Sequence, residues 1–134
     1  MSFQSNELAT AKPAISAGPA ELSVIVPTFN ERANVDAVID ALERVLIGLA
    51  WEVVFVDDNS PDATAEAVRE YARRDPRVRC IQRVGRRGLS SACIEGMLAT
   101  SAPLIAVMDA DGQHDEQALL KMLRKLDDPD IDLV

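Results

Sequence analysis

The sequence predicts an α/β protein in which a mostly parallel sheet carries helices on both faces. Short apolar, β-branched runs alternate with segments of helical periodicity along the chain. The apolar runs are continuous rather than alternating, which is typical of strands buried on both faces of a parallel sheet. Right-handed crossovers are then expected between successive strands.

Composition narrows the class of protein. The chain has 134 residues, 48% hydrophobic and 27% charged, which is enough to bury a core. A net charge of −8 disfavours a nucleic-acid partner. No apolar run approaches the ~18 residues of a membrane span, and the first residues lack a signal-peptide pattern. The two cysteines, Cys80 and Cys93, predict free thiols in a cytoplasmic protein.

The elements can be predicted in chain order. Residues 1–20 are rich in Ala, Ser, Pro and Gly and predict a flexible tail before a folded part at 21–134. Short apolar runs predict strands at 22–27, 51–56, 78–82 and 103–108, with a fifth beginning at 131–134. Helical spacing predicts helices between these strands.

Four helices are expected. Asn30 is positioned to cap the first, whose apolar stripe covers residues 35–49, with Gly48 near its end. Ser60 followed by Pro61 predicts the start of the second, which stops before Pro76. A small-residue helix follows at 89–100, and an amphipathic one at 114–126.

Polar residues gather where the predicted strands end. In open parallel sheets ligands bind outside the carboxyl ends of the strands, so these segments are the place to look for a site. The segments are 27–31, 57–60, 83–88 and 109–111.

Asp109 and Asp111 directly follow an apolar strand. Alternate residues near a strand end point in similar directions, so both carboxylates can share one ion. Mg²⁺ and Mn²⁺ prefer such oxygen ligands and bridge to substrate phosphates. The alternative is a pair of turn or capping aspartates at the start of the next helix.

Asp57 and Asp58 follow the second strand. Adjacent carboxylates repel each other and need something to offset the repulsion. One of them can cap the following helix, or a carboxylate can accept hydrogen bonds from a nucleotide base or ribose.

Several enzyme classes are disfavoured. No G-x-G-x-x-G follows the first strand and no P-loop motif occurs, which argues against dinucleotide dehydrogenases and P-loop NTPases. No Ser-His-acid or Cys-His set is available. The single histidine, His114, is either a partly exposed residue at a helix start, or a third metal ligand or phosphate contact.

Basic residues are concentrated in one segment. Eight of the fourteen Lys and Arg residues lie between Arg69 and Arg87, where only two acids oppose them. Those on the predicted helix face are expected to be solvated. Arg83, Arg86 and Arg87 flank two glycines in a predicted loop and are candidates to bind an anion.

Taken in order, the four strand-end segments resemble the nucleotide-binding half of a family 2 glycosyltransferase with the Rossmann-like GT-A fold. The similar stretches are Leu-Ser-Val-Ile-Val-Pro-Thr-Phe-Asn-Glu at 22–31, Val-Asp-Asp-Asn-Ser-Pro-Asp at 56–62, Arg-Arg-Gly-Leu at 86–89 and Val-Met-Asp-Ala-Asp-Gly-Gln-His at 107–114. The branch they resemble most is that of polyprenol-phosphate (dolichol-phosphate) mannosyltransferase-like enzymes.

The resemblance implies an inverting, metal-dependent transfer of a sugar from a GDP- or UDP-linked donor to an acceptor, with a polyprenyl phosphate as that acceptor. Asp109 and Asp111 would be catalytic and hold Mg²⁺ or Mn²⁺. The residues implied to bind the nucleotide-sugar are Pro27, Thr28, Asn30, Glu31, Asp57, Asp58, Arg86, Gly88 and Ala110. Those implied to contact phosphate or acceptor are Arg83, Arg87, Gln113 and His114.

The resemblance also carries expectations about the whole protein. Family catalytic domains are longer, so residues 21–134 are expected to be the N-terminal part of a truncated domain, inactive alone. Asp115 and Glu116 depart from the family pattern, which often has proline after the Gln-His position. A cytoplasmic location or the cytoplasmic membrane face is expected, with membrane association through a later segment. The alternatives are a non-catalytic nucleotide-binding or interaction module and, less supported, a phosphoacceptor switch.

Overall fold

A computed structural model describes residues 18–111 and 116–134. Gln113, His114 and most of the predicted tail lie outside these residues. The elements, in chain order, are β1 (Leu22–Thr28), the 3-10 turn η1 (Arg32–Asn34), α2 (Val35–Val45), β2 (Trp51–Asp57), α3 (Thr64–Ala72), β3 (Val78–Gln82), α4 (Leu89–Leu98), β4 (Leu104–Val107) and α5 (Glu116–Lys125).

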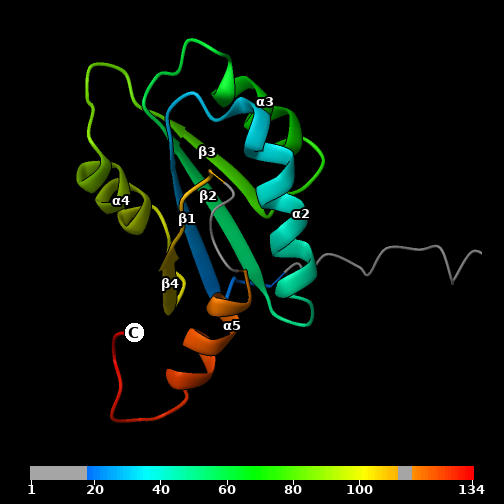
Figure 1. Cartoon of the computed structure of the whole chain (residues 1–134), viewed down its shortest axis with the longest axis vertical. Helices are drawn as coiled ribbons and strands as arrows, with labels where there is room; N and C mark the ends of the chain where they lie inside the picture. Colours follow the sequence, from blue (N-terminus) through cyan, green and yellow to red (C-terminus); the bar gives the residue numbers. More distant parts are fainter. Residues whose placement is uncertain (1–17, 112–115) are drawn as a thin grey trace, which may run out of the picture.

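The four described strands form one parallel sheet in the order β3-β2-β1-β4. β1 lies between β2 and β4 and pairs with β2 along its whole length, from Leu22 opposite Trp51 to Thr28 opposite Asp57. All four strands therefore end at the same edge of the sheet, as Figure 1 shows. The predicted α/β class and the parallel sheet are confirmed.

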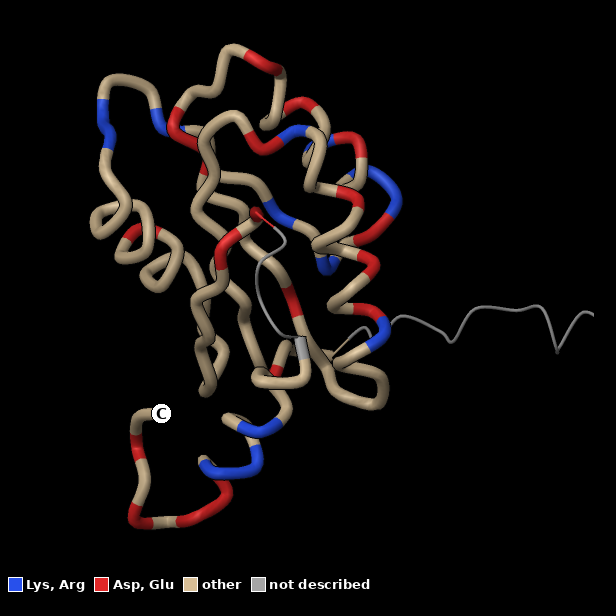
Figure 2. Tube along the Cα trace, in the orientation of Figure 1, with Lys and Arg blue, Asp and Glu red and all other residues tan. Residues whose placement is uncertain are grey.

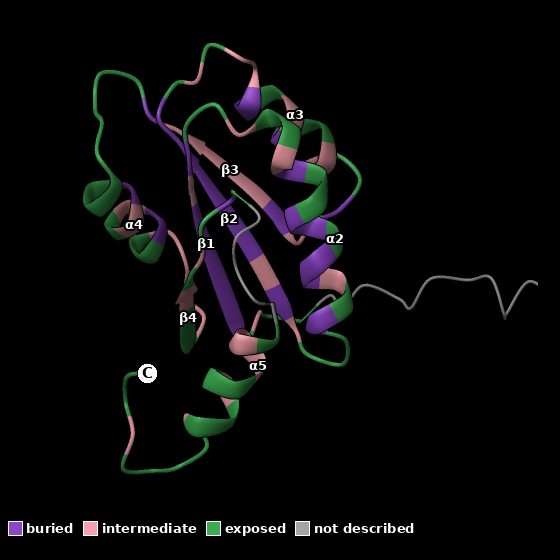
Figure 3. Ribbon diagram, viewed as in Figure 1, coloured by how far each residue is buried: buried purple, intermediate pink, exposed green. Residues whose placement is uncertain are grey.

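Helices cover both faces of the sheet, as the continuous apolar strands predict. Helices α2, α3 and α5 lie on one face and α4 on the other (Figure 1). Successive residues of β1 separate accordingly: Val24 and Val26 join the larger core under α2, whereas Ile25 packs with Val54 and Val56 under α4. Figure 3 shows β1 and β2 as the buried centre.

Helix α4 approaches the sheet closely because it carries a glycine. Gly96 is buried against β1, and a Cβ at this position would lie 2.4 Å from Ile25 Cγ2 and 3.1 Å from Val56 Cγ2. No side chain larger than hydrogen fits without movement. The small-residue composition of 89–100 therefore brings this helix close to the sheet.

Two predicted helix starts are wrong. Asn30 has a left-handed backbone (φ 55°), and helix α2 begins only at Val35 after the turn η1. Ser60 does not cap a helix either: α3 begins at Thr64, after Ala63 with φ 66°. The Ser60 hydroxyl is used elsewhere, because Ser60 Oγ donates to Asp57 Oδ1 and accepts from the backbone N–H of Asn30.

The ends of several elements also differ from expectation. The first helix ends at Val45, and a turn with Gly48 at φ 86° follows instead of continued helix. Residues 131–134 form no strand, and Leu133 is 89% exposed, so the predicted fifth strand is wrong for this structure. Strand β4 pairs with β1 alone among the described strands, and its residues are mostly exposed rather than buried. None of the helices in the described part is long and apolar enough to cross a bilayer.

The arginine-rich segment is largely neutralised within the fold. Figure 2 shows its basic residues distributed along α3, β3 and the following loop. Arg73 pairs with Glu70, Arg77 with Asp75 and Glu43, and Arg79 with Glu52. Three arginines also lie over rings: Arg74 over Tyr71, Arg77 over Trp51 and Arg87 over Phe29. Most of the local excess of positive charge is therefore structural.

Candidate functional site

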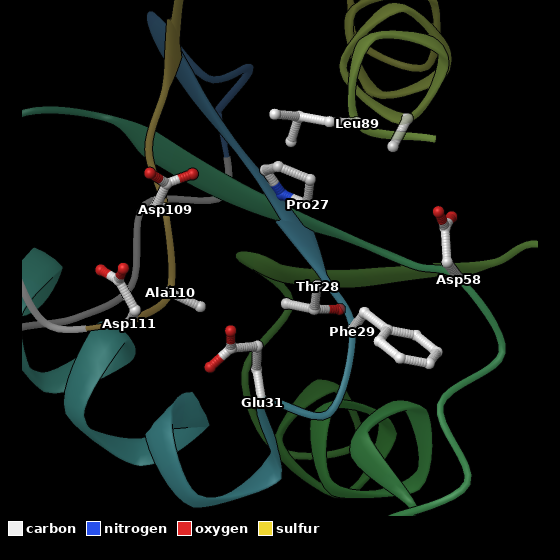
Figure 4. Close-up of a pocket in the computed structure, with 10 residues that line it drawn as sticks. Pro27, Thr28, Phe29, Glu31, Asp58, Leu89, Asp109, Ala110 and Asp111 are labelled. Carbon is white, nitrogen blue, oxygen red and sulfur yellow. The ribbon is translucent and has the colours of Figure 1, made fainter. Parts of the chain in front are cut away.

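A cleft of 340 Å³ opens at the carboxyl ends of the strands. It is lined by the end of β1, by residues that follow β1, β2 and β4, and by the first turn of α4 (Figure 4). These residues are Pro27, Thr28, Phe29, Glu31, Asp58, Leu89, Ala92, Asp109, Ala110 and Asp111. The cleft lies where the general rule for parallel sheets places a ligand.

The turn after β1 is held in place by the loop after β2. Three consecutive backbone N–H groups of the turn donate to side chains of that loop: Asn30 to Ser60 Oγ at 2.9 Å, Glu31 to Thr64 Oγ1 at 3.1 Å and Arg32 to Asp62 Oδ2 at 3.2 Å. The loop after β2, which contains the family-like stretch 56–62, therefore fixes the backbone of the turn after β1.

Asp62 makes several of the bonds that hold this turn. It accepts from the Thr64 amide at 3.0 Å and from the Thr64 hydroxyl, as well as from Arg32 N. Partial desolvation raises the pKa of Asp62, but hydrogen bonds from Thr64 and the Arg32 amide outweigh it and leave the pKa below its usual range. The carboxylate is therefore ionised at neutral pH and acts as a fixed acceptor.

Asp57 is buried behind the cleft. Its side chain accepts from Thr28 Oγ1 at 2.9 Å and from the amide and hydroxyl of Ser60 at 2.9 and 2.6 Å. The residue is 0% exposed and does not line the cleft. The side chain of Asp57 therefore bonds to β1 and to the β2–α3 loop, and it is not placed in the cleft where a base or ribose could reach it.

Asp58 instead lies on the wall of the cleft. Arg83 chelates it, with Nε 2.7 Å from Oδ1 and Nη2 3.0 Å from Oδ2, and the Gly88 amide donates to Oδ2 at 3.0 Å. The hydrogen bond from Arg83 lowers the pKa of Asp58 most, while desolvation opposes it. The cleft thus has one fixed, ionised carboxylate on the β2 side.

Asp109 and Asp111 line the cleft from the β4 side. Figure 4 shows both carboxylates on the side away from Asp58, with Pro27 and Thr28 of β1 between. Both residues are exposed. Within the described residues, no group of three or more His, Cys, Asp or Glu side chains could hold a metal ion.

The loop between β3 and α4 borders the cleft with basic residues. Arg86 pairs with Glu95 at 2.9 Å, and Arg87 lies over the Phe29 ring, 5.4 Å from its centroid. Gly88 precedes α4 with φ 121°, a conformation that side chains rarely adopt. Arg87 makes no ion pair with any described residue, so its charge is offset least in this loop.

The structure brings seven of the fifteen predicted site residues together at the cleft. Of the predicted set, Pro27, Thr28, Glu31, Asp58, Asp109, Ala110 and Asp111 line the cleft. Six do not line it: Asn30, Asp57, Arg83, Arg86, Arg87 and Gly88. Of these, Asp57 bonds to Thr28, and Arg83 and Gly88 bond to Asp58, two residues that do line it. Gln113 and His114 lie outside the described residues.

Sequence reasoning missed three lining residues: Phe29, Leu89 and Ala92. Phe29 and Leu89 are 46% and 64% exposed, unusual for large apolar side chains next to a buried sheet. Their position inside the quoted motifs was the available signal. Ala92 lies on the buried face of α4, where nothing in the sequence distinguishes it from core.

Comparison with known proteins identifies the family of the chain. The sequence profile of Glycosyl transferase family 2 matches residues 23–134. The chain belongs to glycosyltransferase family 2. It is 41% identical over 106 residues to the dolichol-phosphate mannosyltransferase of Pyrococcus furiosus, covering 79% of this chain and 30% of that protein.

Solved structures share the GT-A fold. A mannosyltransferase from Pyrobaculum calidifontis, in complex with GDP-Man and Mn²⁺, superposes with a TM-score of 0.69 at 24% identity, covering 95% of this chain and 39% of that one. Glucosyl-3-phosphoglycerate synthase from Mycobacterium tuberculosis, with Mn²⁺, UDP and glucosyl-3-phosphoglycerate, gives 0.64 at 23% identity, covering 80% and 39%. This family 2 chain therefore spans well under half of the relatives named here.

Proposed function

We propose that this chain is the donor-binding part of an inverting, metal-dependent glycosyltransferase that moves a sugar from a nucleotide-sugar to a polyprenyl phosphate. One observation carries the proposal. The same cleft presents the fixed carboxylate of Asp58 on one side and the Asp109–Asp111 pair on the other. The two sides suit the two ends of a nucleotide diphosphate.

The base and ribose would bind on the β2 side of the cleft. Asp58 offers an ionised acceptor for an N–H group of the base or a ribose hydroxyl, and Phe29 offers an exposed ring beside it. Pro27 and Thr28 line the cleft from the end of β1, and Glu31 lines it from the following turn, whose backbone is held by Ser60, Asp62 and Thr64. This turn is therefore organised before a ligand arrives.

The diphosphate would bind on the β4 side. Asp109 and Asp111 supply oxygen ligands and only two carboxylates, which fits Mg²⁺ or Mn²⁺ because these ions keep positions for water and substrate phosphate. When bound, such an ion stabilises the charge on the leaving nucleoside diphosphate. Both structural neighbours named above hold Mn²⁺. Arg86, Arg87, Gln113 and His114 are the further candidates to contact phosphate or acceptor.

The proposed acceptor would need little help from a general base. A polyprenyl phosphate already carries an ionised oxygen, so direct attack on the anomeric carbon needs little general-base help and inverts its configuration. The similar protein from Pyrococcus furiosus is named a dolichol-phosphate mannosyltransferase. A lipid-linked acceptor would place the reaction at the cytoplasmic face of a membrane.

Calorimetry on the intact protein tests the proposal. GDP-mannose and UDP-glucose are titrated with Mn²⁺ and again after chelation, using the wild type and Asp111→Asn. Asp127→Asn, at an exposed position after α5, is the matched control. Metal-dependent binding of one nucleotide-sugar that Asp111→Asn abolishes and Asp127→Asn leaves intact is expected. A nucleotide-sugar affinity that is the same without Mn²⁺ and in Asp111→Asn would contradict the proposal.

A further inference from the structure

We propose that Arg83 is a positioning residue that, together with the Gly88 amide, occupies three of the about four acceptor positions of Asp58, so that Asp58 recognises one N–H group of the base and no more. The inference rests on the proposed function, in which Asp58 faces the nucleotide base. It assigns to Arg83 a role different from the direct anion contact that the sequence favours.

Arg83 is placed to act through Asp58 rather than on a ligand. Its side chain is 1% exposed and does not line the cleft. Every nitrogen of its guanidinium has a protein acceptor: Nε and Nη2 donate to Asp58, Nη1 to Ser91 Oγ at 2.9 Å, and Nη2 also to the Gly88 carbonyl at 2.9 Å. A guanidinium bonded in this way has little capacity left for a phosphate.

The same contacts decide what Asp58 can still accept. An ionised carboxylate offers about four acceptor positions, two on each oxygen. Oδ2 accepts from Arg83 Nη2 and from the Gly88 amide, and Oδ1 accepts from Arg83 Nε. Among the bonds within the described chain, this leaves one acceptor position, on Oδ1.

A second carboxylate, Glu95, lies close to Arg83 without competing for its hydrogen bonds. Glu95 Oε1 is bound by Arg86, and its Oε2 lies 3.6 Å from Arg83 Nε without a hydrogen bond. Of the two carboxylates near Arg83, only Asp58 accepts hydrogen bonds from it. This bidentate pair requires a planar guanidinium, because a lysine ammonium cannot donate two parallel hydrogen bonds to one carboxylate.

One acceptor position restricts the chemistry of base recognition. Uracil presents a single N–H flanked by carbonyls, which one carboxylate oxygen can accept. Guanine presents an N–H and an amino group side by side, which need two free acceptor positions for a paired contact. Asp58 held by Arg83 therefore takes one of these bonds, and the guanine amino group gains nothing from it.

The chain contains a matched control for Arg83. Arg77 chelates Asp75 in the same way, with Nε 3.1 Å from Oδ1 and Nη2 2.8 Å from Oδ2. It precedes β3, whereas Arg83 follows it, so the two pairs lie at opposite ends of that strand. Substitution at Arg77 removes a comparable ion pair far from the cleft.

Calorimetric titration of the intact protein with UDP and GDP in the presence of Mn²⁺ tests the positioning role. Arg83→Met is expected to weaken binding at least about tenfold, Arg83→Lys to restore part of the loss, and Arg77→Met to leave it unchanged. Equal binding by the Arg83 and Arg77 variants would overturn the inference. Failure of the wild type to bind either nucleotide would instead overturn the proposed function.

The single-acceptor restriction is tested in the folded wild type. If GDP binds, IDP, which lacks the amino group, is expected to bind within about threefold of it. If UDP binds, its N3-methyl derivative is expected to bind at least about tenfold more weakly. A preference for GDP over IDP above about tenfold that Asp58→Asn removes, or unchanged binding of the methylated UDP, would overturn the inference.

Discussion

Thr28 Oγ1 donates to Asp57 Oδ1 at 2.9 Å across the junction of β1 and β2, and both residues are buried. The bond continues the pairing of the two strands into their side chains, at the last register pair of the ladder. Asp57 then holds Ser60, and Ser60 holds the amide of Asn30. The cleft-forming turn is thus anchored to the sheet through one buried carboxylate.

Asp57→Asn is therefore expected to destabilise the fold. An amide has one oxygen acceptor where the carboxylate has two, so Thr28 Oγ1 and the two Ser60 donors cannot all keep their bonds. Loss of a hydrogen bond to a buried charged group costs about 1–3 kcal/mol of unfolding free energy. Urea denaturation measures it, with the exposed Asp127→Asn as control. A change of less than about 0.5 kcal/mol in Asp57→Asn would contradict this role.

Acid stability should depend on Asp58. The hydrogen bond from Arg83 is the largest cause that holds its pKa below the usual range; the Gly88 amide and the charges of Arg83 and Arg87 add to it, against desolvation. A carboxylate with a lowered folded pKa stabilises the fold above its unfolded pKa of about 3.9, and this contribution is lost as pH falls through the folded pKa.

The measurement is a comparison of urea midpoints for the wild type and Asp58→Asn between about pH 6 and pH 2. Because the substituted amide cannot titrate, the advantage of the wild type is expected to be constant near neutrality and to shrink below about pH 4. An advantage that stays the same, or grows, on acidification would contradict the assignment.

Helix α4 provides a prediction about packing. Gly96→Ala places a methyl group 2.4 Å from Ile25 Cγ2, and overpacking of this kind costs about 1–3 kcal/mol. An exposed mid-helix Gly→Ala would instead stabilise the helix by about 1 kcal/mol. Net destabilisation is expected, with Ser90→Ala, exposed in the same helix, near neutral. Thermal unfolding distinguishes the two signs, and a stabilised Gly96→Ala would refute the close approach.

The order of elements could be predicted from the sequence because it depends on local periodicity. Strand β3 has the predicted limits, and the α/β class follows from continuous apolar runs. The helix starts could not be predicted, because Ser60 and Asn30 are good caps by residue type but are used in contacts between loops 30 residues apart. Such bonds depend on tertiary structure that a local rule cannot anticipate.

The candidate site could also be predicted only in part. Asp58, Asp109 and Asp111 could be placed together, because parallel strands end at one edge. The role of Arg83 could not, since an arginine in a glycine-flanked loop usually signals an anion site. Its burial against Asp58 is visible only once β2 and β3 are paired.

Arg87 is predicted to contact the diphosphate of a bound nucleotide. It lies over Phe29, which lines the cleft, and it forms no ion pair among the described residues. Its charge is therefore available to a diphosphate. Arg87→Gln is expected to weaken binding of UDP or GDP severalfold, because a charge-assisted bond is lost, while binding of the free nucleoside changes little.

The control is Arg73→Gln, which removes an exposed arginine that pairs with Glu70 beside α3. It should leave both affinities unchanged, which separates a local contact from the effect of net charge. Raising the salt concentration should narrow the difference between wild type and Arg87→Gln, since screening weakens an exposed contact. Equal losses for nucleoside and nucleotide would show that Arg87 acts through the Phe29 ring rather than on phosphate.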